Sequence, residues 1–421
     1  MIQSTVTRSV ALMALVALGA PTQARPAGVT TEAESFAVVV EAPEHGTLTV
    51  EPPIPADGKV PAGTVLVATA TPDEGYALDS GFYVVPGRFG RMYHESPTST
   101  FEVVIDRDKA IGASFIEKDS LRGFSVLQDV VYAKPGVKEL KYDVYQPDGA
   151  RGLPIVVIVH GGGWGANDES IMRGLGRFLA KTGDYVVASV DYRWLGEGDG
   201  DEVPNSMAKL IEDVFGAIVH IQEHAAEYGG DASRIAVTGD SAGGHLSAAA
   251  ANMTAMIGDG GFGEEPGVFQ YAPTYMPAGM TLAGVRAALS EGIRAAAPSY
   301  GVFSAEALGG ANERLGGTPL SEDAVRAIAP GAQIPSADRR SVPQFLLRGT
   351  EDPLIRFEEV DSYASALKAA GQKAVHVEVE GAGHAFFDWK PDAETKATFE
   401  RYGVKYAGEM KAFFDSVFDG D

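Results

Sequence analysis

Cysteine is absent from the 421 residues of the sequence. A chain without thiols forms no disulfide, builds no structural metal site on thiolates and offers no N-terminal cysteine for lipid attachment. The stability of the folded protein must therefore come from packing.

Basic residues are scarce. The sequence has 34 Lys and Arg against 57 Asp and Glu, which gives a formal net charge of -23 at pH 7. Domains that bind nucleic acid usually carry a basic patch that faces the phosphates. The charge balance therefore predicts a soluble protein that does not bind nucleic acid.

Hydrophobic runs of membrane-spanning length are also absent. The apolar stretch near the N-terminus covers residues 10–20, and these 11 residues are too few to cross a bilayer. Arg8 precedes this stretch and Thr22-Gln23-Ala24 follows it, an order typical of secretory signal peptides. We therefore predict a signal peptide at residues 1–24, a linker at residues 25–34 and a secreted or periplasmic protein. A membrane anchor is the alternative.

The chain is longer than one typical domain, which predicts two folded units of unequal size. Residues 35–118 contain short runs rich in Val and Thr, separated by Pro, Gly and Asp, with no helical periodicity. This pattern predicts a small all-β domain. The expected strands cover residues 36–40, 46–50, 64–70 and 100–105.

The succession of residues 45–50, 63–65, 70–76 and 113–115 resembles the bacterial surface repeat module of the internalin B-repeat type. The sequence departs from that family at Gly81-Phe82-Tyr83, where the family has a tryptophan. The resemblance implies adhesion or display, so the β domain is expected to hold the protein near a surface or polymer. The alternative is a spacer that covers part of the second unit.

Residues 119–421 begin with a predicted β-hairpin, residues 124–133 and 140–145, and then alternate between apolar runs and helical stretches. Strands and helices in alternation predict a mostly parallel sheet wrapped by helices, an α/β fold with its chemistry at the carboxyl ends of the strands. The expected strands are 154–159, 185–190, 235–237, 293–297, 345–347 and 375–379, and the expected helices include 206–228, 357–370 and 393–418.

Residues 239–243 read Gly-Asp-Ser-Ala-Gly and lie between an apolar run and a helical stretch. In the G-x-S-x-G pattern the serine sits on a sharp turn from strand to helix, and the glycines allow those two elements to approach. Ser241 is therefore the predicted nucleophile of a hydrolase.

A glycine triplet follows the run 155–159, in the segment His160-Gly161-Gly162-Gly163-Trp164. Backbone N–H groups that converge on one point can stabilise a tetrahedral oxyanion. We predict an oxyanion hole formed by the N–H groups of Gly162, Gly163 and Ala242, with the N–H of Trp164 as a further donor. The alternative is a phosphate-binding loop, which the lack of a P-loop lysine disfavours.

A serine needs a base, and histidine is suited to that role near neutral pH. His384 follows the last predicted strand on a glycine-flanked loop, whereas the other histidines lie in the β domain, inside predicted elements or in the glycine loop. Asp352 follows the strand 345–347 and lies between serine and histidine in chain order, as the triad acid does in this type of fold. Glu351 is the alternative acid, and Asp388 comes too late in the chain.

These motifs, together with residues 140–147 and Asp191-Tyr192-Arg193, resemble the α/β-hydrolase superfamily over residues 123–421. The likeness is greatest to bacterial esterases of the hormone-sensitive-lipase-like and the feruloyl or acetyl xylan esterase groups. The resemblance implies an α/β-hydrolase fold and ester hydrolysis without a cofactor or metal. The usual Leu-Ala-Pro-Glu after this tripeptide is replaced by the acidic, glycine-rich segment 194–201.

Residues 253–291 form an insertion with aromatic and methionine residues among glycines and prolines, including Phe262, Phe269 and Met280. Such residues on a loop can cover an apolar acyl pocket. The insertion is therefore a candidate lid, with a surface excursion as the alternative. The predicted substrate contacts are Trp164, Trp194, Tyr271, Tyr275 and Met276.

The sequence thus predicts a secreted serine esterase that acts through an acyl-enzyme, first on acyl or feruloyl esters of plant polysaccharide. Polyesters and small aromatic esters are alternative substrates. A peptidase of the same fold is disfavoured because no propeller-like repeats precede the catalytic unit, and a non-catalytic adhesion protein is disfavoured by the complete triad.

Overall fold

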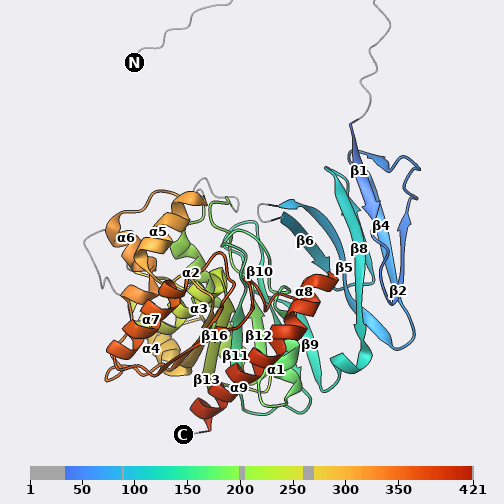
Figure 1. Ribbon diagram of the computed structural model, residues 1–421. Helices are drawn as coiled ribbons and strands as arrows, with labels where there is room; N and C mark the ends of the chain where they lie inside the picture. The colour runs from blue at the N-terminus through green and yellow to red at the C-terminus, as the bar shows by residue number, and fades with distance from the viewer. Residues whose placement is uncertain (1–33, 88–89, 199–203, 259–269, 316, 420–421) are drawn as a thin grey trace, which may run out of the picture.

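The computed structural model describes residues 34–87, 90–198, 204–258, 270–315 and 317–419. The predicted signal peptide, nearly all of the predicted linker, part of the segment 194–201, and Phe262 and Phe269 lie outside these residues. Within them the chain forms an N-terminal β domain and a larger C-terminal domain that lie side by side (Figure 1).

Two sheets make up the β domain in the described residues. Alternate residues of the Val- and Thr-rich runs, such as Leu66 and Ala68 on β4 and Phe101 and Val103 on β7, point into a common core. The first sheet has the order β3-β1-β8-β5-β6 and the second β2-β4-β7. The strands are β1 (Ser35–Val40), β2 (Gly46–Glu51), β3 (Lys59–Pro61), β4 (Val65–Pro72), β5 (Tyr76–Gly87), β6 (Gly90–Ser96), β7 (Thr100–Val104) and β8 (Lys109–Glu117).

The four strands expected in this domain are present as β1, β2, β4 and β7, whereas β3, β5, β6 and β8 were not predicted. β5 and β6 contain Asp, Gly, Pro, Arg and Glu, residues that are typical of turns or exposed surfaces rather than of a buried strand. They lie on the side of the β domain that faces the C-terminal domain, and their charged residues find partners there (Figure 1).

An eight-stranded sheet of order β16-β15-β14-β13-β11-β12-β10-β9 forms the centre of the described C-terminal domain. β9 and β10 are antiparallel to their neighbours and the other strands are parallel. Every expected strand of this domain is present. They are β9 (Phe124–Ala133), β10 (Leu140–Pro147), β11 (Leu153–Val159), β12 (Val186–Val190), β13 (Gly230–Asp240), β14 (Ile293–Ser299), β15 (Gln344–Gly349) and β16 (Ala374–Val379).

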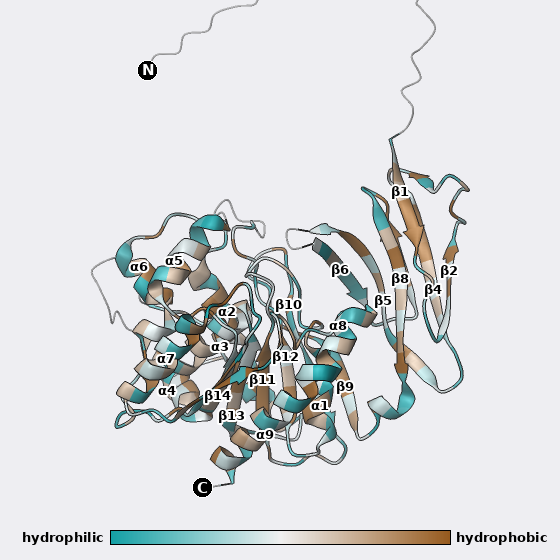
Figure 2. Ribbon diagram, viewed as in Figure 1, coloured by the Kyte–Doolittle hydropathy of each residue, from teal (hydrophilic) through white to brown (hydrophobic). Residues whose placement is uncertain are grey.

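The sheet is buried on both faces, which explains its nearly continuous apolar runs. On β11, Ile155, Val157 and Val159 belong to one core, while Val156 and Ile158 belong to the core on the opposite face. Helices α2 (Met207–His224) and α4 (Leu282–Gly292) pack in the first core, and α1 (Arg173–Lys181), α7 (Phe357–Ala369) and α9 (Val404–Phe418) in the second. The apolar strands therefore lie inside a shell of helices (Figure 2).

The remaining helices connect or cap these layers. Thr281, Ser304, Ser321 and Asp392 each accept a backbone N–H with the side chain at a helix start, which fixes where α4, α5, α6 and α8 begin. These and the other short elements are η1 (Lys118–Leu121), α3 (Ala242–Asn252), η2 (Thr254–Met256), α5 (Ala305–Arg314), α6 (Glu322–Ile328), η3 (Pro330–Ala332), α8 (Ala393–Thr398) and the π-helical turn η4 (Phe399–Gly403).

A buried group of charges joins the two domains. The carboxylate of Asp79 on β5 lies 3.0 Å from Nε of Arg173, 2.7 Å from Nη1 of Arg177 and 3.1 Å from Nζ of Lys396. Glu95 on β6 pairs with the same Arg173 at 2.8 Å. We call these five residues the Asp79 cluster. Burial alone would raise the pKa of Asp79, but the three cations outweigh it and hold that pKa well below its ordinary value.

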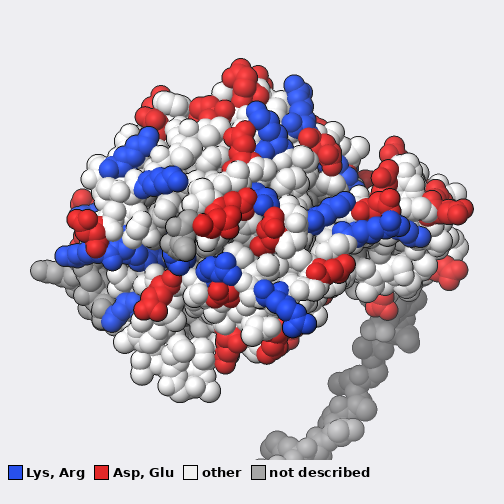
Figure 3. All heavy atoms as spheres, turned by 90° about the horizontal axis from the view of Figure 1, so that it is seen from below, with Lys and Arg blue, Asp and Glu red and all other residues white. Residues whose placement is uncertain are grey.

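The charged surface is mixed on the face shown in Figure 3, where Asp and Glu side chains are interspersed with Lys and Arg. In the part of the chain that the structure describes, no helix has the length and apolar character needed to cross a membrane.

Candidate active site

Ser241 lies on a tight turn between β13 and α3, with φ 51° and ψ -114°. A non-glycine residue with positive φ is strained, and here the strain presents the hydroxyl at the carboxyl edge of the sheet. The flanking glycines are required by space: a Cβ on Gly239 or Gly243 would lie 2.4 or 1.9 Å from the carbonyl oxygen of Val159. The turn therefore has the geometry that the sequence pattern predicted.

The predicted nucleophile, base and acid form one hydrogen-bonded chain. Nε2 of His384, from the loop after β16, lies 2.9 Å from Oγ of Ser241. Nδ1 of the same ring lies 2.8 Å from Oδ2 of Asp352, which follows β15. Three residues that are 32 and 111 positions apart in sequence are thus brought within hydrogen-bond distance.

Asp352 is held as an anion. Its Oδ1 accepts the backbone N–H groups of Leu354 at 2.8 Å and Ile355 at 2.9 Å. Burial opposes ionisation, but the hydrogen bond and charge of His384 and these N–H groups outweigh it and lower the pKa of Asp352. A carboxylate acceptor at Nδ1 places the imidazole proton there, so Nε2 is free to accept the proton of Ser241.

The predicted oxyanion donors are available. Gly162 and Gly163 have φ of 121° and 58°, and a Cβ on Gly162 would lie 2.2 Å from the carbonyl oxygen of Ala166. Among the described residues, no acceptor takes the N–H of Gly162, Gly163 or Ala242. Ala242 is also the first residue of α3, where the partial positive charge of the helix favours an anion. The structure thus leaves three unpaired donors beside the nucleophile.

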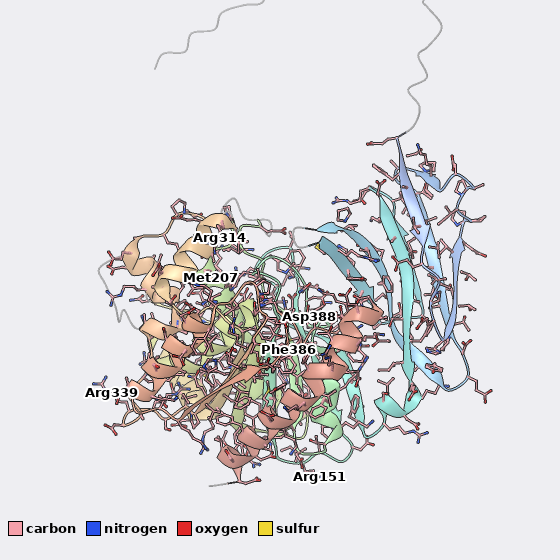
Figure 4. All side chains as sticks on the ribbon, viewed as in Figure 1. Arg151, Met207, Arg314, Arg339, Phe386 and Asp388 are labelled. Atoms are coloured by element: carbon pink, nitrogen blue, oxygen red, sulfur yellow. The ribbon has the colours of Figure 1, made fainter. Side chains whose placement is uncertain are left out.

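A carboxyl pair beside the nucleophile was not predicted as part of the site. Oδ1 of Asp240 accepts the N–H of Gly161 at 2.6 Å and so fastens the glycine loop to the nucleophile turn. Burial, and then the charge of Asp388, with which it shares a hydrogen bond, raise the pKa of Asp240 well above its ordinary value. Nζ of Lys390 lies 3.2 Å from Asp388. Asp388 and Phe386 are both buried and are labelled in Figure 4. Asp388 comes after His384 in the chain, and it contacts Asp240 rather than the imidazole.

Tyr300, which directly follows β14, was not predicted as part of the site. Its ring packs edge-on against His384, with 4.9 Å between the centroids, and its hydroxyl accepts the N–H of Phe387 at 3.2 Å. Its position directly after a parallel strand was the signal that could have identified it.

Both tryptophans predicted to contact substrate have other partners. Trp164 is buried and its Nε1 donates to Nδ1 of His245 at 3.1 Å. Trp194 donates from Nε1 to the carbonyl oxygen of Asn167 at 3.1 Å. Neither tryptophan lines the Ser241 cavity within the described residues. The indole N–H of Trp164 instead attaches the glycine loop to His245 of α3, and that of Trp194 attaches the chain after β12 to Asn167.

The aromatic residues of the insertion also lie elsewhere. Tyr271 is buried against Phe215 and donates to the carbonyl oxygen of Ala327 at 2.9 Å, and Tyr275 donates to Glu223 on α2. Met276 packs against the first core. The described part of the insertion, residues 253–258 and 270–291, therefore adds to the layer around α2 and contributes no residue to the Ser241 cavity. The rest of the candidate lid lies outside the described residues.

The cavity that opens over Ser241 has a volume of about 190 Å³. Both domains line it. The β domain contributes Gly87, Gly90, Arg91 and Met92, and the C-terminal domain contributes Gly162, Gly163, Ala166, Asn167, Asp240, Ser241, Leu354, His384, Ala385, Asp388 and Lys390. Among the residues that the structure describes, no group of His, Asp and Glu side chains is arranged to bind a metal ion.

The mostly parallel sheet and the nucleophile turn after β13 define the C-terminal domain as an α/β-hydrolase fold. Solved structures share it: the apo form of Thermogutta terrifontis esterase 2 is 25% identical, with a TM-score of 0.51 over 70% of this chain and 96% of that chain. The form of the same esterase phosphonylated by sarin is also 25% identical, with a TM-score of 0.51 over 70% of this chain and 95% of that one.

Sequence comparisons point to the same class of protein. Residues 142–267 match the BD-FAE family and residues 276–414 the dienelactone hydrolase family. Carboxylesterase NlhH of Mycobacterium tuberculosis is 38% identical over 34% of this chain and 41% of NlhH. Esterase LipQ of the same organism is 29% identical over 61% of this chain and 56% of LipQ. The chain thus spans only about two fifths to just over a half of the length of these relatives.

Proposed function

We propose that the protein is a serine carboxylic-ester hydrolase that works through an acyl-enzyme. One observation carries the proposal. A hydrogen-bonded chain runs from Asp352 through His384 to Ser241, and Ser241 lines a cavity that the glycine loop also lines. This arrangement combines an activated nucleophile with donors for an oxyanion, the two requirements of acyl transfer. The esterase names of the relatives support the same activity.

Acylation begins when Oγ of Ser241 attacks the ester carbonyl carbon and its proton moves to Nε2 of His384. The carbonyl oxygen becomes an oxyanion, which the N–H groups of Gly162, Gly163 and Ala242 stabilise. Asp352 stabilises the imidazolium through Nδ1–H. When the tetrahedral intermediate collapses, Nε2–H gives its proton to the leaving alcohol and the acyl group stays on Oγ.

Deacylation repeats these steps with water in place of the serine hydroxyl. His384 removes a proton from the water, the hydroxide oxygen attacks the acyl carbon, and the same N–H groups stabilise the second oxyanion. His384 then returns the proton to Oγ of Ser241, and the carboxylic acid leaves.

A direct test is hydrolysis of p-nitrophenyl acetate by Ser241→Ala. Loss of a triad nucleophile lowers kcat by about a millionfold, so no turnover above the uncatalysed rate is expected at ordinary enzyme concentration. Ser247→Ala is the matched control, because it removes a buried hydroxyl from α3, the helix that follows Ser241, and leaves the triad unchanged. Circular dichroism shows whether both variants fold; a folded Ser241→Ala that still turns over would refute the proposal.

We infer that the natural substrates are acyl or feruloyl esters of plant polysaccharide, reached after export through the predicted signal peptide. The inference rests on the family resemblance of the motifs. A panel of acetylated xylan, feruloylated arabinoxylan, a polyester film and p-nitrophenyl esters ranks the substrate classes by kcat/KM. N-terminal sequencing of the protein from its native host tests cleavage after Ala24.

A peptidase of the same fold is the competing activity. A matched pair of substrates, an aminoacyl p-nitroanilide and the corresponding p-nitrophenyl ester, separates the two. The proposed esterase hydrolyses the ester and leaves the anilide intact at the same enzyme concentration.

A further inference from the structure

The hairpin formed by β5 and β6 reaches from the β domain to the catalytic cavity. Gly87 ends β5 and pairs with Gly90, the first residue of β6, and Arg91 and Met92 follow. All four residues line the cavity that holds Ser241. The wall of the cavity is therefore completed by a domain that begins more than a hundred residues before the nucleophile in sequence.

The same two strands carry the anions that fasten the domains together. Asp79 lies on β5 and Glu95 on β6, and both are buried in the Asp79 cluster with Arg173 of α1. Trp389, from the loop after His384, donates from Nε1 to Asp79 at 3.0 Å. The hairpin is thus fixed at its base to the helix that follows the glycine loop and to the loop that follows the catalytic histidine.

Contacts nearer the cavity continue this attachment. The pKa of Tyr93 is raised to about 12, by burial and then by Asp392, with which it shares a hydrogen bond. The guanidinium of Arg91 lies 5.3 Å from the centre of the Tyr93 ring and 2.5 Å from Glu41. The interaction of Tyr93 with Asp392 therefore holds β6 beside the segment that follows His384, whereas the contacts of Arg91 with Tyr93 and Glu41 lie within the β domain. A tether that only displays the enzyme would not need the contact with Asp392.

We propose that the β5–β6 hairpin is a fixed wall of the substrate cavity and that Met92 is a specificity-determining residue, which limits the bulk of the ester that reaches Ser241. The cavity has a volume of about 190 Å³, and the side chain of Met92 forms part of its wall. The side chain therefore limits the space that remains for a branched or aromatic substituent of the ester. The inference rests on the proposed esterase function and gives the β domain a role in recognising the ester itself.

The absence of cysteine makes this wall easy to probe in the full-length protein. Met92→Cys introduces the sole thiol of the chain. The thiol then attacks a methyl or benzyl methanethiosulfonate, which forms a mixed disulfide that carries a methylthio or a benzylthio group at that position and releases methanesulfinate. Met280→Cys is the matched control, since Met280 is 43% exposed and lies in the insertion, away from the Ser241 cavity. Labelling of Ser241 by a small fluorophosphonate reports access to the nucleophile without relying on ester turnover.

The benzyl adduct on Met92→Cys should slow fluorophosphonate labelling of Ser241 and lower kcat/KM for a naphthyl ester about tenfold more than for a methyl ester. The methyl adduct should have a smaller effect, and adducts on Met280→Cys should change neither rate. Met92→Ala and Met92→Trp should move the naphthyl-to-methyl ratio in opposite directions, whereas a folding defect would lower both rates together.

Two ester series identify the part of the substrate that meets the wall. Esters of one acid with different alcohols form the same acyl-enzyme. If Met92→Trp changes only the rate of acylation, Met92 contacts the alcohol part of the ester. If it also changes the rate of deacylation, Met92 contacts the acyl part. Unchanged ratios in both series and equal labelling rates would overturn the proposal. A wild-type protein that hydrolyses no ester yet shows the size-dependent block of labelling would contradict the proposed function instead.

Discussion

The Asp79 cluster should be essential for keeping the β domain docked. In Asp79→Asn the carboxylate becomes a neutral amide of similar shape, so Arg177 and Lys396 lose their buried counter-charge and Arg173 keeps only Glu95. Removal of one member of a buried ion pair costs about 3–5 kcal/mol, and the amide oxygen retains part of the hydrogen bonding. We expect a loss of about 3 kcal/mol in the free energy of unfolding.

Urea unfolding and calorimetry measure that loss. For the C-terminal domain of about 300 residues, whose entropy of unfolding is about 2.1 cal/mol/K per residue, a decrease of about 3 kcal/mol corresponds to a Tm lower by about 5 °C. Tryptophan fluorescence adds a local probe, because the indole of Trp389 donates to Asp79. Asp73→Asn is the control: Asp73 is an exposed aspartate of the same domain and should leave the Tm unchanged.

The pH dependence of this effect has a definite sign. The pKa of Asp79 is well below its unfolded value of 3.8, so its contribution to stability is complete above about pH 5 and is lost only as the pH falls through the lowered pKa. The difference between wild type and Asp79→Asn should therefore be constant from pH 5 to 8. A variant within about 0.5 kcal/mol of wild type in this range would refute the clamping role of the cluster.

Two further predictions concern the catalytic domain. Asp352→Asn should lower kcat about ten-thousandfold with little change in KM, because the amide favours the wrong imidazole tautomer; a loss of less than tenfold in steady-state assays would exclude Asp352 as the orienting acid. Asp240→Asn keeps an acceptor for the N–H of Gly161 but has no proton to release. Because the pKa of Asp240 is raised in the folded state, wild type loses stability as the pH rises above 3.8. The urea midpoint of the variant should therefore rise relative to that of wild type as the pH increases above 3.8, and a difference that does not change with pH would contradict the raised pKa of Asp240.

The motifs around Ser241 and His384 allowed the triad geometry to be anticipated because each is local. A turn of glycines after a strand fixes where a serine points, and chain order in this fold restricts the acid to the loop before the histidine. The strands of the central sheet could be predicted equally well, since a strand that is buried on both faces has a nearly continuous apolar sequence. The hydrogen bonds at 2.8 and 2.9 Å then follow from the fold.

Contacts between distant segments could not be anticipated in this way. Asp79 and Trp389 are 310 residues apart, and nothing local marks a charged residue within β5 as the partner of an indole on another domain. For the same reason, the contribution of Met92 to the cavity was not predicted. Trp164 and Trp194 illustrate a second limit, because an aromatic side chain near a site suits packing and substrate contact equally well.

The identity of the residue that carries the acyl group is the central claim, and covalent labelling tests it most directly. Wild-type protein treated with a fluorophosphonate should gain the mass of one adduct, located by peptide mapping on Ser241, and should lose esterase activity in proportion to labelling. Ser241→Ala should gain no adduct. An adduct on another residue that accompanies the loss of activity, or full turnover by Ser241→Ala, would contradict the proposed mechanism.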